Sequence, residues 1–278
     1  MTVVDAHAHV FAAVSDRFPR DVHELFPAEA EATAEELLAE MARAGVDLAV
    51  LVPLTHHDEY LRDCLERFPG KFAGIGVQRP GSVDVDEYRR RREQSRLQGL
   101  RLFALGEAGE LAALPLLAEL ARLGDKLWFY GGREQMQLLE RALDRLPELT
   151  VVLNHLGFWP TAFHADEHGR PHFDTTYTAE GLEAVTALAR FPRVYVLCTG
   201  MYAFAAGPCP YDDLRPVTAA LLRAYGPGRL LAGSDFPWIR AEPGYAETIG
   251  AVDAHFAGLP EAERARIRGG NALELFTF

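Results

Sequence analysis

Short apolar runs alternate with segments of helical periodicity along the whole chain. The run at 47–54 is continuous, as strands buried on both faces of a parallel sheet require. The segment 35–43 repeats its apolar residues at helical spacing and stops at Gly45, a residue typical of helix ends. Apolar runs lie at 2–10, 47–54, 72–77, 99–103, 126–130, 150–155, 193–198 and 229–232, and helical periodicity follows them. The pattern predicts eight βα units and hence an α/β fold of the (β/α)8 or TIM-barrel type.

No internal boundary or low-complexity linker interrupts this alternation, so we expect a single barrel domain over residues 1–278. An open, doubly wound sheet would give the same alternation, but no glycine-rich phosphate turn follows the first strand. The longest segments without a regular pattern, 11–32, 158–177 and 200–213, follow the first, sixth and seventh strands. In a barrel such loops cover the carboxyl ends of the strands, where active sites are built.

Composition and charge narrow the classes of partner. The formal net charge of −12 disfavours nucleic acid and anionic membranes as partners, which leaves a small molecule. Cys64, Cys198 and Cys209 form no paired framework, as expected in a reducing compartment. No basic leader precedes the first strand, and no apolar run approaches the length of a membrane span. We therefore expect a cytoplasmic protein; whether it forms a homo-oligomer is left open.

The first strand carries three polar residues on one face, because Asp5, His7 and His9 occupy alternate positions. Burying them is costly unless a metal, a hydrogen-bond network or a substrate satisfies them. The alternative is that one histidine makes a structural hydrogen bond and the other is solvated at the strand end. Closure of a barrel would bring Asp235, which follows the last strand, next to His7 and His9. Taken alone, Asp235 would as readily cap the turn that follows it.

The ends of other strands add Arg101, Tyr130 and His155 as candidates. An arginine that points into a barrel needs an anion, either Asp5 in a salt bridge or a carboxylate of the substrate. Tyr130 is a candidate substrate contact or a packing residue, and His155 a site residue or a core histidine. Arg79, in the loop after the third strand, is a further candidate substrate contact, although loop arginines are usually solvated.

The loop at 158–177 is rich in histidines and aromatic residues. Its histidines are spaced by four, which on a helix would suggest a metal site, but Gly169 and Pro171 argue against a helix. We expect these histidines to be solvated lid residues and the aromatic side chains to form an apolar wall for a ring-shaped substrate. The residues concerned are His164, His168 and His172, and Phe158, Trp159 and Phe163.

Four motifs, in chain order, resemble the amidohydrolase superfamily. They are Asp-Ala-His-Ala-His at 5–9, Gly-Leu-Arg at 99–101, Asn-His-Leu-Gly at 154–157 and Gly-Ser-Asp-Phe-Pro at 233–237. The resemblance covers nearly the whole chain. It is closer to the branch of 2-pyrone-4,6-dicarboxylate lactonase and sugar lactonases than to the aminocarboxymuconate-semialdehyde and resorcylate decarboxylases. Together the motifs are specific for the superfamily and weak for the substrate.

The resemblance implies a metal site, with one departure. In metal-dependent members the residues that match His7, His9 and Asp235 hold a divalent metal, usually with a histidine at the end of the fifth strand. That strand here ends in Phe-Tyr-Gly at 129–131, without a histidine. The three residues would still make the open site that catalytic zinc uses, with manganese as the alternative metal. The lactonase branch also lacks that histidine and can work without metal, so both alternatives stay open.

The mechanism that the resemblance implies is attack of water on an ester carbonyl. Asp235 would act as general base, and His155 would polarise the carbonyl. His7 and His9 would either bind the metal or complete that hydrogen-bonding cradle. The favoured hypothesis is therefore a hydrolase of small cyclic esters. The alternatives are a metal-dependent nonoxidative decarboxylase of a small aromatic or muconate-like acid, and a non-catalytic barrel that binds a ligand.

Overall fold

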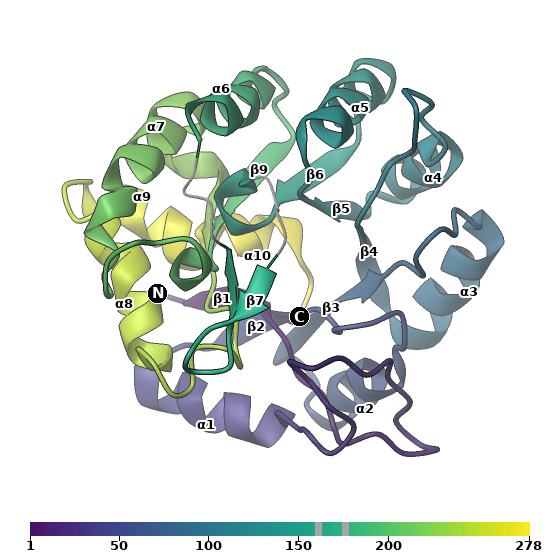
Figure 1. Ribbon diagram of the computed structural model, residues 1–278, viewed down its shortest axis with the longest axis horizontal. Helices are drawn as coiled ribbons and strands as arrows, with labels where there is room; N and C mark the ends of the chain where they lie inside the picture. The colour runs from purple at the N-terminus through teal and green to yellow at the C-terminus, as the bar shows by residue number, and fades with distance from the viewer. Residues whose placement is uncertain (159–162, 174–177) are drawn as a thin grey trace.

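Eight parallel strands form a nearly closed barrel, and helices surround it (Figure 1). The computed structural model describes residues 1–158, 163–173 and 178–278. The barrel strands are β1 (Val4–Ala8), β2 (Leu48–Leu51), β3 (Phe72–Val77), β4 (Leu97–Leu102), β5 (Lys126–Phe129), β6 (Thr150–Leu153), β9 (Val194–Cys198) and β10 (Leu230–Ala232), paired in that order. The predicted (β/α)8 fold is confirmed, and the strands lie within the apolar runs that predicted them or begin up to two residues earlier.

The helices pack their apolar faces on the outside of the barrel. They are α1 (Ala34–Ala44), α2 (Glu59–Arg67), α3 (Val85–Ser95), α4 (Leu114–Leu123), α5 (Arg133–Arg145), α6 (Ala179–Ala187), α7 (Arg215–Tyr225), α8 (Tyr245–His255), α9 (Glu261–Ala265) and α10 (Asn271–Leu275). Local sequence sets their ends. Thr33 and Glu36 form a capping box at the start of α1, and Gly45 ends that helix in the left-handed conformation, with φ of 70°. Of the described residues, no helix is both long and apolar enough to cross a membrane.

The interior of the barrel is filled by side chains. Val50, Ile75 and Val152 belong to a buried apolar cluster that alternates with outward-facing residues along the strands. Trp128 of β5 is the largest fully buried side chain of this cluster, and Phe276 packs against its indole with ring centres 5.7 Å apart. The C-terminal segment thus closes the amino end of the barrel interior and leaves the carboxyl end open.

The first and last strands are joined by hydrogen bonds beyond the end of β10. The amide of Asp235 donates to the carbonyl of His7 (2.9 Å), and the amide of His9 donates to that of Phe236 (2.7 Å). The Asp5 carboxylate accepts from the Ser234 amide (2.8 Å), from the Ser234 hydroxyl (2.6 Å) and from the Tyr245 hydroxyl (2.9 Å). Because these bonds are buried, Asp5 fixes the position of the segment that carries Asp235.

The loop after β6 contains a two-stranded antiparallel hairpin instead of an irregular lid. Its strands are β7 (Phe163–Ala165) and β8 (Pro171–Phe173), and His164 lies opposite His172 in the register. Figure 1 shows β7 in front of the carboxyl end of the barrel. His164 and His168 are exposed and His172 is half-buried, which agrees with lid histidines that face solvent. Gly169, with φ of 70°, forms the turn that excludes a helix here.

Candidate active site

A cavity of about 500 Å³ opens at the carboxyl end of the barrel. Polar side chains from the strand ends form part of its lining, namely His9, Arg101, His155 and Asp235. Aromatic side chains make up much of the rest, and they are Phe26, Phe103, Tyr130, Phe158, Phe173, Tyr202 and Trp238. The cavity therefore combines an apolar wall with a few convergent polar groups, as small-molecule sites usually do.

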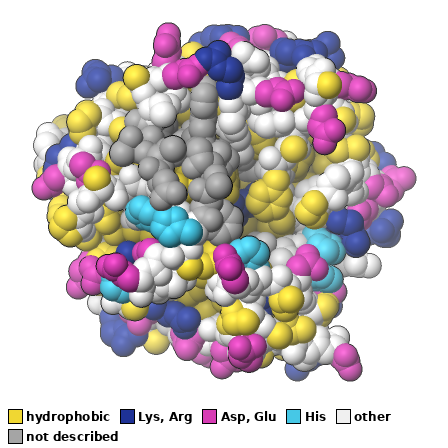
Figure 2. Space-filling view, in the orientation of Figure 1, with side chains coloured by type: hydrophobic (Ala, Val, Ile, Leu, Met, Phe, Trp, Pro, Cys, Tyr) yellow, Lys and Arg dark blue, Asp and Glu magenta, His cyan; other side chains and the backbone are white. Residues whose placement is uncertain are grey.

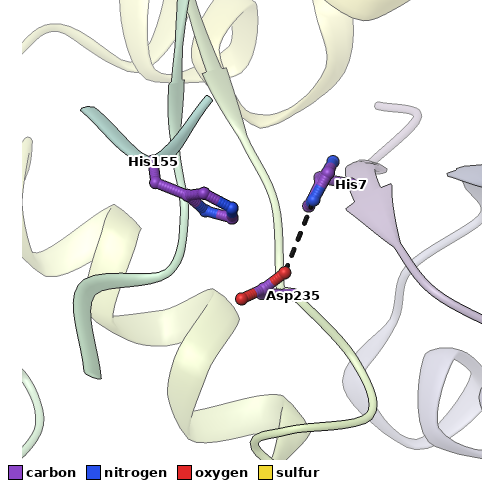
Figure 3. A group of neighbouring side chains, drawn as sticks. All are labelled: His7, His155 and Asp235. Carbon is purple, nitrogen blue, oxygen red and sulfur yellow. Dashed lines mark ion pairs between the residues drawn. The ribbon is translucent and has the colours of Figure 1, made fainter. Parts of the chain in front are cut away.

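The side chains of His7, His155 and Asp235 come from three separate segments and converge (Figure 3), and the last two line this cavity. Nε2 of His7 lies 3.4 Å from Oδ1 of Asp235, and Nε2 of His9 lies 3.3 Å from the same oxygen. The Tyr202 hydroxyl donates to Oδ2 of Asp235 at 2.8 Å. Among the described residues, Oδ1 has no partner with hydrogen-bonding geometry, although it is buried. It keeps acceptor capacity for a group that enters from the cavity.

Unusual backbone conformations are concentrated at this cluster. His155, Leu156 and Asp235 all have positive φ, at 48°, 57° and 63°. Non-glycine residues rarely adopt this region, and such conformations cluster at functional sites. Gly200 lies against the imidazole of His155, and a Cβ at Gly200 would come within 2.4 Å of Nδ1. The fold thus accepts local strain and uses a glycine to place the His155 ring.

Burial and mutual contacts set the charges of the cluster. Burial alone would raise the pKa of Asp235, but His155, His7 and His9 together hold it well below the usual carboxyl value. Burial lowers the pKa of His7 well below its usual value and that of His155 to about 4. Burial and the adjacent Asp235 raise the pKa of the Tyr202 hydroxyl well above its usual value. At neutral pH the cluster therefore contains an aspartate anion, neutral imidazoles at His7 and His155, and the protonated phenol of Tyr202.

Two hydrogen bonds fix the tautomers of the histidine pair. The indole Nε1–H of Trp128 donates to Nδ1 of His7 at 3.0 Å, so the neutral His7 ring carries its proton on Nε2. Nδ1 of His9 lies 2.7 Å from the Val52 carbonyl oxygen, which can only accept, so Nδ1 carries the proton there. The other ring nitrogen of His9, Nε2, lies beside Oδ1 of Asp235.

The same contacts test whether the residues fit a metal. His7, His155 and Asp235 offer ligand atoms that lie within 4.8 Å of one another, a suitable donor set for a divalent ion. However, the bond from Trp128 leaves a proton, not a lone pair, on the Nε2 atom of His7 that faces Asp235. A metal bound through His7 does not fit this hydrogen-bonding arrangement.

Arg101 lies at the cavity wall and is nearly buried, with 8% of its surface exposed. Its Nη2 donates to the Tyr130 hydroxyl at 3.0 Å, and its guanidinium lies over the Phe103 and Tyr130 rings. The alternative of a salt bridge to Asp5 is wrong, because Asp5 is occupied by Ser234 and Tyr245. Within the described ranges Arg101 has no carboxylate at ion-pair distance, so its charge is left for an anion that enters the cavity.

Of the other predicted substrate contacts, Tyr130 and Phe158 line the cavity and Arg79 does not. Tyr130 and Phe158 stack on each other, with ring centres 5.7 Å apart, and both line the cavity. Arg79 does not join them: it lines a separate depression, 58% of its side chain is exposed, and its Nε lies 3.8 Å from Glu87. Trp159 lies outside the described residues.

Two residues of the cluster were not among the sequence candidates, Trp128 and Tyr202. The sequence did contain a signal for Trp128. It lies two positions before Tyr130, so the two side chains point to the same side of the strand. Tyr202 lies in the loop after β9, in a short 3-10 helix (Met201–Ala203). Its contact with Asp235 depends on the path of that loop, which no periodicity encodes.

Comparisons with known proteins agree with the barrel fold. A family model described as Amidohydrolase matches residues 4–278. A structure of a probable 2-pyrone-4,6-dicarboxylic acid hydrolase from Acinetobacter baumannii, with citric acid bound, has a TM-score of 0.77 and 18% identity, and the alignment covers 100% of both chains. An amidohydrolase from Burkholderia multivorans with bound zinc has a TM-score of 0.77, 21% identity and 99% coverage of each chain.

A third structure, 5-carboxyvanillate decarboxylase from Sphingomonas paucimobilis, has a TM-score of 0.65 and 17% identity, with coverage of 99% of this chain and 98% of that chain. No curated protein matches the chain. At these identities the structures show a common fold and leave the substrate open.

Proposed function

Because the chain belongs to the amidohydrolase family, we propose that it is a hydrolase of small cyclic esters that carry a carboxylate. One observation carries the proposal. The ionised Asp235, with its unfilled acceptor Oδ1, lies at a cavity that also contains the nearly buried cation of Arg101. A base and an anion-binding group in one aromatic cavity suit an electrophilic ring that bears a carboxylate.

The chemistry follows from the hydrogen-bonding capacities at the cluster. Oδ1 of Asp235 is an unfilled acceptor at the cavity, so a water molecule that enters the cavity can donate to it, and Nε2 of His9 lies 3.3 Å from the same oxygen. Asp235 takes the proton as the water oxygen attacks the ester carbonyl, the ring C–O bond then breaks, and Asp235 returns the proton to the departing ring oxygen. His155, which lines the same cavity, stabilises the charge that develops on the carbonyl oxygen.

Other residues position the reacting groups. Tyr202 donates to Oδ2 of Asp235 and leaves Oδ1 as the oxygen that acts on water. Trp128 holds His7 in the tautomer whose Nε2–H faces Asp235. Arg101 binds the substrate carboxylate, and the stacked rings of Tyr130 and Phe158 lie along a planar ring substrate. No step in this sequence requires a metal.

Nonoxidative decarboxylation is the second candidate. The observation that favours it is again Arg101, because a buried guanidinium holds the carboxylate of a substrate acid as readily as that of a lactone. The similarity to 5-carboxyvanillate decarboxylase shows that this fold also supports such chemistry. The metal-dependent form of that reaction requires a different His7 tautomer from the one that Trp128 supports.

The test is a set of initial rates measured with a pH indicator on carboxylated pyrone lactones, muconolactones and neutral sugar lactones. We expect proton release from the carboxylated lactones, no release of carbon dioxide, and unchanged rates after dialysis against a chelator. Carbon dioxide release without lactone opening would replace the proposal by decarboxylation. Absence of both reactions would leave a ligand-binding barrel.

The tautomer argument predicts how Trp128→Phe changes metal binding. Loss of the indole N–H allows the His7 ring to carry its proton on Nδ1, which leaves the lone pair of Nε2 facing Asp235. We expect the affinity of the central cluster for zinc to rise about tenfold or more, the scale of effects that partners of metal ligands produce. Calorimetric titration with zinc measures this affinity, and Val152→Ala, which also removes volume inside the barrel, is the packing control. Equal zinc affinities in all three proteins would refute the argument.

A further inference from the structure

A second group of metal-ligating side chains lies at the carboxyl end of the barrel, outside the central cluster. Nδ1 of His56 lies 3.2 Å from Oδ2 of Asp21, and Nε2 of His57 lies 3.6 Å from Oδ1 of the same carboxylate. The three side chains offer ligand atoms that all lie within 4.8 Å of one another. Figure 2 shows histidine side chains beside acidic ones on this face of the molecule. We call Asp21, His56 and His57 the rim cluster.

The spacing within the rim cluster matches what one small cation requires. A tetrahedral zinc ion with nitrogen and oxygen ligands at about 2.0–2.1 Å separates its ligand atoms by about 3.4 Å. The distances from the His56 and His57 nitrogens to the Asp21 carboxylate, 3.2 Å and 3.6 Å, lie near that value, each to a different oxygen of the carboxylate. The imidazoles of His56 and His57 are themselves close, with ring centres 4.1 Å apart and planes inclined by 35°. One ion can therefore reach both rings and the carboxylate with little rearrangement.

The surroundings of His56 also suit a metal ligand. Only 13% of its side chain is exposed, and its Nδ1 has no partner with hydrogen-bonding geometry among the described residues. Nδ1 therefore keeps capacity for a bond that the described part of the protein leaves unmade.

His57 has a carboxylate on each side. Its Nε2 faces Asp21, while its Nδ1 lies 3.9 Å from Oε2 of Glu59, an oxygen that is buried and lacks a geometric hydrogen-bond partner within the described ranges. In many metal sites one ring nitrogen of a histidine binds the metal while an outer carboxylate holds the other, and His57 lies between two carboxylates in this way. At 3.9 Å the two atoms are not hydrogen-bonded, so Glu59 would hold Nδ1–H of His57, and leave Nε2 free for the ion, only after a small approach.

The nearby cations are already neutralised. Arg91 forms a two-point ion pair with Asp58, at 2.7 Å and 3.0 Å, and Arg79 lies 3.8 Å from Glu87. Asp21 is 59% exposed on its side chain, so it can adjust to an ion that arrives from solvent. Asp21 and the adjacent Glu59 supply negative charge at the rim cluster, which favours a divalent cation.

We propose that the rim cluster is a binding site for a divalent transition-metal ion of the zinc class, with Asp21, His56 and His57 as ligands and water completing the coordination. The ion would join the loop after β1, which contains Asp21, to the segment between β2 and α2, which contains both histidines. These segments also supply Leu25 and Leu54 to the cavity lining, so the ion braces one wall of the cavity mouth. The site is separate from the ester chemistry proposed above and does not depend on it.

Equilibrium dialysis against zinc alone, followed by elemental analysis, tests this site. The double variant Asp21→Asn/His57→Gln should bind zinc at least tenfold more weakly at one site than the wild type. Asp16→Asn is the matched control, because it removes the same charge from an exposed aspartate of the same loop. In Asp235→Asn, which alters the central cluster, the rim zinc should be retained. Thermal unfolding followed by circular dichroism checks that each variant is folded.

A second measurement reports on the loop itself. Arg17, with 74% of its side chain exposed, lies in the same loop as Asp21 and is a site for trypsin. Zinc should slow cleavage there several-fold in the wild type and in Asp16→Asn, and leave the rate unchanged in the double variant. The proposal is overturned if the double variant binds zinc like the wild type, or if all bound zinc is lost in Asp235→Asn.

Discussion

Replacement of Asp235 by asparagine should lower kcat for the lactone by about 10²–10⁴-fold, the range attributed to a positioned general base. Asparagine has nearly the same size, and its carbonyl oxygen can still accept from the Tyr202 hydroxyl, so the cavity should keep its shape. What is lost is the anion that takes a proton from water. Initial rates of proton release at saturating substrate give kcat, and binding of the reaction product, measured by calorimetry, should change little.

The control for this variant is Asp212→Asn, which changes an exposed aspartate of the loop after β9 that pairs with Arg215. Its kcat should equal that of the wild type. Activity of Asp235→Asn should recover partly as the pH rises, because hydroxide needs no base. A variant that turns over at the wild-type rate would show that Asp235 is only structural and would remove the proposed mechanism.

The position of Asp235 illustrates how much of this site the sequence determines. The alternate spacing of Asp5, His7 and His9 requires one strand face, and the barrel pattern requires the first and last strands to meet. From these two facts the proximity of His7 and Asp235 follows, and the structure places them 3.4 Å apart. Strand periodicity and closure are local and topological properties, so they can be inferred before any side chain is placed.

Contacts that depend on the path of a loop could not be inferred in this way. Tyr202 reaches Asp235 only because the segment after β9 turns back over the barrel. Arg79 lies just after the end of β3, and Arg101 lies just before the end of β4. Arg79 nevertheless lies near Glu87 and outside the cavity. Whether a polar residue near a strand end faces the cavity is decided by tertiary packing, which the hydrophobic pattern does not record.

Replacement of Arg101 should have the second large effect on catalysis, because its side chain lines the cavity. Arg101→Met keeps the apolar stem beside Phe103 and Tyr130 but removes the guanidinium. Hydrogen bonds to charged groups contribute about 1.5–3 kcal/mol, so KM for a carboxylated lactone should rise about 10–100-fold. KM for a neutral sugar lactone should stay within about twofold, because that substrate has no carboxylate to lose. Initial rates over a range of concentrations of both substrates separate KM from kcat.

Arg79→Met is the matched control for Arg101→Met, since it removes the same charge from a largely exposed arginine that lies outside the cavity. We expect its KM for both substrates to equal that of the wild type. Arg101→Lys should recover only part of the affinity, because an ammonium group lacks the planar pair of donors that match a carboxylate. If Arg101→Met raised KM equally for both lactones, Arg101 would support the cavity wall, through Tyr130, and would not recognise the substrate anion.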